Sequence, residues 1–176
     1  MRRMREKFEF TLHGHAVQFE VHPENELLSN IFRNEGAYSR NDIEVMSRVL
    51  KAGDIYIDAG ANIGWHTVIA AKMVGSSGKV IAFEPEPKNL ELLRRNIELN
   101  ALTNVEVIPK AVMDEAGPRE LHVSNFNSGD HIVGLSVATS AHVTKVSIEA
   151  TTLDETIARL ALDPAKIAMI KADIQG

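Results

Sequence analysis

Hydrophobic and polar residues alternate along residues 7–22, on both sides of the sequence HGH. Strict alternation is typical of a strand with one buried face, and two such runs joined by a short glycine-containing segment predict a β-hairpin. Gly14 is expected at the turn because glycine readily adopts the positive φ angles that tight hairpin turns require. We therefore predict a hairpin near the N-terminus.

Helical spacing of the hydrophobic residues follows the hairpin. Residues 24–34 predict a short helix, and residues 41–54 contain a second one. Asn41 and Glu44 have the spacing of a capping box and are expected at the start of this second helix. Its buried positions are expected to be Ile43, Met46 and Leu50, with Val45 and Val49 beside them.

Strand and helix patterns then alternate along the chain. Repeated strand-helix-strand units predict an α/β fold with a mostly parallel central sheet and helices on both faces. The strands are expected at 55–60, 79–84 and 105–112, and the helices at 65–74 and 87–100.

The pattern is less regular after residue 112. Residues 119–124 and 145–151 predict two antiparallel strands around a long loop, which contains Asn127 and Gly129 and is a candidate lid. Thr152 begins a helix with a capping box, and a last strand follows in IAMIKADIQG. We divide the chain into a hairpin and helical lead-in, residues 1–39, and an α/β domain, residues 40–176.

Composition and charge narrow the classes of function. The 176 residues are 44% hydrophobic and 24% charged, with a net charge of -5 and no cysteine. Acidic charge argues against nucleic acid as a partner, and the absence of cysteine excludes disulfides and cysteine nucleophiles. We expect a cytoplasmic protein without membrane contact, because no segment approaches the ~18 consecutive apolar residues of a membrane helix.

Candidate chemistry lies where the parallel strands end, since ligands of open α/β sheets bind beyond the carboxyl ends of the strands. Glycines allow a sharp turn and the close approach of a ligand, and the helix that follows directs its N–H groups at a carboxylate or phosphate. Glu84, about 20 residues after the glycine turn, is placed to accept hydrogen bonds from ribose hydroxyls. The candidates at the other strand ends are Asp58, Gly60, Asn62 and Gly64 after the first strand and Lys171 and Asp173 after the last.

Two nucleoside cofactors fit this arrangement, and one is favoured. The dinucleotide motif G-x-G-x-x-G is absent, because the loop reads GANIG, and so is the phosphate-binding lysine motif. S-adenosyl-L-methionine is favoured, since its amino-acid end suits a helix N-terminus and its ribose suits a carboxylate. No metal is expected, because the histidines lack ligand spacing, and His66 is expected to face solvent.

Five ordered motifs, DAGANIGWHT, GKVIAFEPEPKNLELLRRNIELN, VEVIPKAV, TTLDE and MIKADIQG, resemble the FkbM family of S-adenosylmethionine-dependent methyltransferases. The resemblance implies a Rossmann-like methyltransferase fold and O-methylation of a hydroxyl on a sugar or small metabolite. It places Lys171 and Asp173 beside the transferred methyl group, with Asp173 as the candidate base. It also implies that Asp58, Gly60, Asn62 and Gly64 surround the methionine part, Glu84 the ribose, and Ala111 and Val112 the adenine.

Departures from the family pattern keep alternatives open. Gln175 stands where the family usually has a glutamate, and the chain ends near the fourth strand of a seven-stranded sheet. We therefore expect a C-terminally shortened chain with an exposed edge strand, which a homo-oligomer could complete. The alternatives are an S-adenosylmethionine-binding module without catalysis or dependent on assembly, and a nucleotide-binding half of an oxidoreductase.

Overall fold

The computed structural model describes residues 5–22, 26–35, 38–124, 131–133 and 143–174. Gln175 and the loop residues Asn127 and Gly129 lie outside these ranges. The strands are β1 (Glu6–Leu12), β2 (His15–Val21), β3 (Ile55–Ala59), β4 (Lys79–Phe83), β5 (Val105–Ile108), β6 (Ala111–Val112), β7 (Gly117–Ser124), β8 (His131–Val133), β9 (Val143–Thr151) and β10 (Ile167–Ala172). The helices are α1 (Glu26–Glu35), α2 (Arg40–Val49), α3 (Trp65–Val74), α4 (Pro87–Leu99), α5 (Leu153–Arg159) and the short 3-10 helix η1 (Pro164–Lys166).

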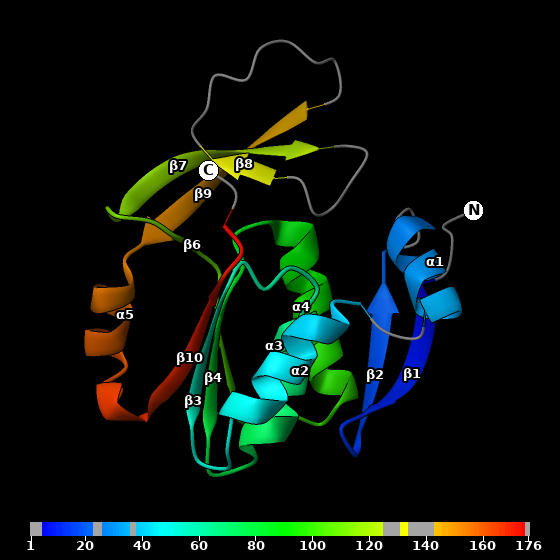
Figure 1. Cartoon of the computed structure of the whole chain (residues 1–176). Helices are drawn as coiled ribbons and strands as arrows, with labels where there is room; N and C mark the ends of the chain where they lie inside the picture. Colours follow the sequence, from blue (N-terminus) through cyan, green and yellow to red (C-terminus); the bar gives the residue numbers. More distant parts are fainter. Residues whose placement is uncertain (1–4, 23–25, 36–37, 125–130, 134–142, 175–176) are drawn as a thin grey trace.

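A parallel sheet of four strands, in the order β10-β3-β4-β5, forms the centre of the fold (Figure 1). Tyr56 and Val80 face a core shared with α2 and α3, and Ala82 faces α4. Ile57 and Phe83 point to the opposite face, where Leu153 of α5 packs. Alternation along each strand therefore gives two buried faces, and the predicted α/β sheet with helices on both faces is confirmed.

The predicted N-terminal hairpin is also confirmed. β1 and β2 pair antiparallel, and the turn residues His13 and Gly14 both have positive φ angles, 46° and 81°. Phe10 and Phe19 of the hairpin contact the indole ring of Trp65 at the start of α3. The hairpin thus packs into the same core as the central sheet. The division of the chain after residue 39 stays a prediction.

Helix α3 is buried on nearly every side rather than on one. It lies between the central sheet and the hairpin, so side chains from Trp65 through Ala71 are all buried. A helix that is apolar all round is expected where two layers cover it. The second covering layer comes from a hairpin that is far away in the chain.

The capping box predicted for α2 is wrong. The cap position is Ser39, two residues before Asn41; the helix begins at Arg40, and the Ser39 side chain makes no capping hydrogen bond. Glu44 instead pairs with Arg48 one turn further on, with 2.9 Å between nitrogen and oxygen. Val45 and Val49 are exposed beside the buried Ile43 and Met46.

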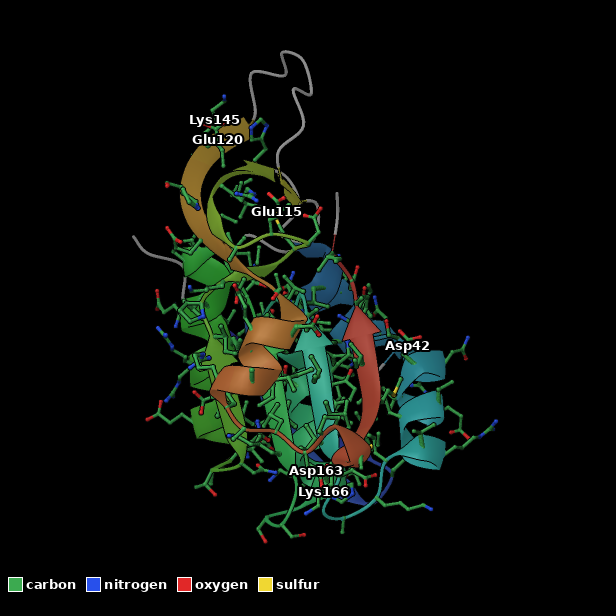
Figure 2. The ribbon with its side chains drawn as sticks, turned by 90° about the vertical axis from the view of Figure 1, so that its left-hand side faces the viewer. Asp42, Glu115, Glu120, Lys145, Asp163 and Lys166 are labelled. Carbon is green, nitrogen blue, oxygen red and sulfur yellow. The ribbon has the colours of Figure 1, made fainter. Side chains whose placement is uncertain are left out.

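The third predicted strand, residues 105–112, is two strands in the structure. β5 ends at Ile108, and Pro109 follows, which has no backbone N–H to continue a ladder. β6 then joins a second sheet of order β6-β9-β7-β8, in which β7 and β9 pair antiparallel as predicted. Lys145 Nζ and Glu120 Oε1 on these two strands lie 2.7 Å apart. Figure 2 labels both residues on this sheet.

The C-terminal elements begin with a helix whose predicted cap is confirmed. The Thr152 hydroxyl accepts from the Glu155 N–H at 3.1 Å, and the Glu155 carboxylate accepts from the Thr152 N–H at 3.3 Å. β10 pairs with β3 and forms one edge of the central sheet. Among the described residues, no helix is long and apolar enough to cross a membrane.

Candidate functional site

The carboxyl ends of β3 and β10 bring two of the predicted residues together. Lys171 and Asp58 are register partners on these parallel strands, and the Lys171 ammonium lies 3.2 Å from Asp58 Oδ1. Asp58 is fully buried, and its other carboxylate oxygen accepts a hydrogen bond of 2.6 Å from the Thr67 hydroxyl. Both oxygens of this buried carboxylate therefore have partners, as a buried charge requires.

The same ammonium group bridges two further groups at the strand ends. Lys171 Nζ donates to the carbonyl oxygen of Gly60 at 3.2 Å and lies 3.6 Å from Asp173 Oδ2. Asp173 extends from the end of β10 with its side chain 61% exposed. Lys171 thus connects the buried carboxylate of Asp58 to the exposed carboxylate of Asp173.

Close packing of the protein itself accounts for both loop glycines. Gly60 has a φ of +83°, and a Cβ there would lie 2.2 Å from the backbone oxygen of Asp173. Gly64 has a φ of +92°, and a Cβ there would lie 2.6 Å from Leu93 Cδ1. The sequence-based explanation, close approach of a ligand, is therefore not needed for either position. Contact with a cofactor stays a prediction for both.

Every backbone N–H from residue 60 to residue 64 is used inside the protein. The first two donate to the Phe83 carbonyl, at 3.1 and 2.8 Å. Asn62 N–H donates to Glu84 at 2.7 Å, Ile63 N–H donates to the Asn62 side chain at 2.7 Å, and Gly64 N–H donates to the Ala61 carbonyl at 2.8 Å. These N–H groups are therefore already bound within the protein, whereas the first N–H groups of the helix that follows lack acceptors within that helix.

Helix α3 begins at Trp65, and Gly64 before it has no side chain to cap the helix. In contrast, Glu86 caps α4 by accepting from the Asn89 N–H at 2.6 Å, and Thr152 caps α5. The first N–H groups of a helix lack acceptors within the helix, and its dipole favours a negative group there. The first turn of α3 can therefore receive a carboxylate.

Glu84 lies directly after β4 and is buried, with 4% of its surface exposed. Its two carboxylate oxygens accept from the N–H groups of Asn62, at 2.7 Å, and Glu86, at 2.8 Å. Burial raises the pKa of Glu84 from 4.5 to about 7, although these two hydrogen bonds oppose the rise. The carboxylate is therefore held beside the glycine loop.

The two residues predicted beside adenine belong to the second sheet. Ala111 and Val112 form β6 and pair with Ala150 and Thr151 of β9. Ala111 is buried in the core of that sheet, whereas Val112 packs against the core of the central sheet. They link the two sheets, and their contact with a cofactor stays a prediction.

His66 is buried, with 7% of its surface exposed, so the prediction of a solvent-facing position is wrong. Its ring lies against Tyr38, and its Nε2 atom is 3.5 Å from Asp42 Oδ2 without a hydrogen bond. Figure 2 shows Asp42 at the start of α2, beside β10. Burial lowers the pKa of His66, and the nearby carboxylates of Asp58 and Asp42 only partly oppose this effect.

Sequence reasoning missed Thr67 and Glu86, which hold Asp58 and the start of α4. The sequence signal for Glu86 was its place directly before Pro87, a residue typical of a first helical turn. No spacing rule pointed to Thr67. Among the described residues, no group of three or more potential ligands is arranged to hold a metal ion.

Comparison with known proteins gives one family match. Residues 58–176 match the model of the methyltransferase FkbM domain. The probable cobalt-precorrin-6B C(15)-methyltransferase (decarboxylating) of Sulfolobus acidocaldarius is 43% identical over 56 residues, which cover 32% of this chain and 29% of that protein. Protein-L-isoaspartate O-methyltransferase 2 of Archaeoglobus fulgidus is 39% identical over 59 residues, which cover 34% and 27%.

Among solved structures, a chain described as a putative rRNA-methylase from Clostridium thermocellum aligns with a TM-score of 0.40 and 24% identity. The alignment covers 40% of this chain and 39% of that one. The matched segments span less than a third of the length of the two curated relatives, 29% and 27%.

Proposed function

Because the chain belongs to the FkbM methyltransferase family, we propose that it binds S-adenosyl-L-methionine at the carboxyl edge of its central sheet and catalyses methyl transfer. One observation carries the proposal: the Glu84 carboxylate lies 2.7 Å from the Asn62 N–H, beside the uncapped N-terminus of α3. A site that joins an anion-binding helix end to a hydroxyl-binding carboxylate suits a ligand with an amino-acid group and a ribose.

Each part of the cofactor has residues of matching chemistry. The first turn of α3 would receive the methionine carboxylate, and the loop residues Asp58, Gly60, Asn62 and Gly64 would surround the methionine part. Glu84 would accept from the ribose hydroxyls, since each carboxylate oxygen can accept a further hydrogen bond besides its backbone donor. Ala111 and Val112 would border the adenine.

The chemistry needs few protein groups. Bound cofactor supplies an electrophilic methyl group on a positively charged sulfur. Holding the acceptor oxygen in line with that bond can supply about 7 to 11 kcal/mol of the barrier. Transfer would form a bond from the acceptor oxygen to the methyl carbon and break the carbon–sulfur bond. Asp173, exposed at the end of β10, would take the hydroxyl proton, and Lys171 would hold its carboxylate in place.

The proposed acceptor is a hydroxyl of a sugar or small metabolite. The relatives are named for a cobalt-precorrin and for isoaspartyl protein, so they do not fix the acceptor of this chain. The net charge of -5 favours a small acceptor over nucleic acid. A homo-oligomer stays a prediction.

Calorimetric titration with S-adenosylmethionine, and separately with NAD, tests the proposal. Saturable binding of S-adenosylmethionine with no heat from NAD is expected, and binding of NAD alone would overturn it. Glu84→Gln should weaken binding, whereas Glu98→Gln, on the exposed side of α4, should not. Product analysis with a panel of sugar hydroxyls then separates an enzyme from a module that binds without transfer. Asp173→Asn should abolish turnover while cofactor binding persists.

A further inference from the structure

Asn96 of α4 and Asn100, the residue directly after this helix, bind the free edge of strand β2. Asn100 accepts from Gln18 N–H at 2.9 Å and donates to the carbonyl of the same residue at 2.7 Å. Asn96 does the same with Glu20, at 2.8 and 3.1 Å. Two residues of a strand and four residues of a helix both span about 6 to 7 Å, so successive asparagines meet successive outward-facing residues of the strand.

Only one of these two side chains also reaches the glycine loop. The remaining N–H of Asn96 donates to the Ile63 carbonyl at 2.8 Å, and Asn96 is fully buried. The remaining N–H of Asn100 donates to the Asn96 carbonyl of α4. Each side chain therefore makes three hydrogen bonds, two of them to β2. The third goes to the glycine loop for Asn96 and to the backbone of α4 for Asn100.

The carbonyl that Asn96 holds belongs to the peptide unit that leads into α3. This carbonyl belongs to Ile63, one residue before Gly64. The Gly64 carbonyl is the first acceptor of the helix and accepts from Val68 N–H at 2.9 Å. The N–H of the same peptide unit, from Gly64, donates to Ala61. With both polar groups bound, the plane of this peptide and the direction of the first turn of α3 are fixed.

We propose that Asn96 is a positioning residue for the cofactor. It connects the N-terminal hairpin to the glycine loop, so that the packing of β2 fixes the direction in which the first turn of α3 points. This inference rests on the proposed function. The hairpin, although far from the strand ends in sequence, thereby controls cofactor affinity through a single side-chain amide.

Asn96→Ala and Asn100→Ala form a matched pair, since each removes three side-chain hydrogen bonds from the same helix face. Both should lower the denaturation midpoint to a similar extent. At a temperature where circular dichroism shows both variants folded, the S-adenosylmethionine Kd should rise about tenfold for Asn96→Ala and less than about threefold for Asn100→Ala. Equal Kd values for the two variants would overturn the inference.

If Asn96→Ala does not fold, hydrogen exchange in the unmodified chain tests the role of Asn96 instead. Coupling between two sites is reciprocal, so bound cofactor should stabilise the Asn96 contacts. S-adenosylmethionine should slow exchange of the Glu20 amide at least about tenfold more than that of the Gln18 amide. Equal slowing of both amides contradicts the inference, whereas failure of the unmodified chain to bind the cofactor contradicts the proposed function itself.

Discussion

The ammonium of Lys171 lies 3.2 Å from Asp58 Oδ1, and this aspartate is fully buried at the centre of the sheet. Removing one partner of a buried ion pair leaves the other charge unpaired, which costs about 3 to 5 kcal/mol. Lys171→Met should lower the free energy of unfolding by about that amount. Urea denaturation at pH 7 measures the change.

A double variant provides the control for this pair. Asp58→Asn in the Lys171→Met background removes the stranded carboxylate, so part of the lost stability should return. If the double variant is less stable than Lys171→Met by the full cost of Asp58→Asn alone, the two side chains are not energetically coupled. That outcome would contradict a stabilising ion pair between Asp58 and Lys171.

Gly60 should tolerate substitution less than any glycine whose surroundings are open. An alanine there meets the Asp173 carbonyl at 2.2 Å, whereas Gly14, with a similar φ of +81°, has nothing within 4 Å of an added Cβ. Gly14→Ala should cost about 1 kcal/mol for the backbone conformation alone. Gly60→Ala should cost at least about 2 kcal/mol more, because the backbone of Asp173 must shift. Comparable melting temperatures for the two variants would show that the backbone of Asp173 does not pack on Gly60.

Glu84 should make stability fall as the pH rises. Burial raises its pKa from 4.5 to about 7, so the folded state binds the proton more tightly than the unfolded state. The contribution of Glu84 to the free energy of unfolding is greatest below about pH 4.5. This contribution decreases by about 3 kcal/mol as the pH rises to about 7. Urea denaturation between pH 4.5 and 8 should show this slope, and Glu84→Gln should remove it.

Cofactor affinity should follow the same ionisation in the opposite direction. Under the proposed function the ionised Glu84 carboxylate accepts from the ribose hydroxyls, so S-adenosylmethionine should bind more tightly as the pH rises from 6 to 8. Calorimetric Kd values at several pH values measure this. An affinity independent of pH in the unmodified chain would argue against the ribose contact.

His66 should act on stability with the reverse sign. Burial lowers its pKa below 6.5, so the folded state resists protonation, and stability is lost as the pH falls below about 6.5. In His66→Gln the side chain is uncharged at every pH. The loss of stability between pH 7 and pH 5 should therefore be smaller in this variant than in the unmodified chain. An equal loss of stability in both chains would mean that His66 is not shielded from solvent.

Local hydrophobic pattern was sufficient to predict the strand and helix order from β3 to α4. The prediction failed where neighbouring elements decide the outcome. The two buried sides of α3 depend on a hairpin that is remote in sequence, and Asn96 reads as an ordinary helical asparagine until Glu20, 76 residues away, is placed against it. Residues 105–112 form two strands instead of the predicted one, because Pro109 has no backbone N–H to continue the ladder.

The site divides in a similar way. The meeting of Asp58 and Lys171 followed from parallel strands ending at one edge, which is a general property of α/β sheets. The cause of the Gly60 requirement could not be predicted, because the group that crosses it is the backbone of Asp173, more than a hundred residues later. The burial of His66 was missed because its neighbour Asp42 lies on another helix.

Titration of the isotope-labelled chain with S-adenosylmethionine, followed by amide chemical shifts in NMR spectra, tests the central claim most directly. The predicted result is saturable shifts that are largest at the N–H groups of His66 and Thr67 in the first turn of α3 and at Asn62 and Glu86 beside the Glu84 carboxylate. Shifts confined to the second sheet, or none at saturating cofactor, would contradict a cofactor site at this edge.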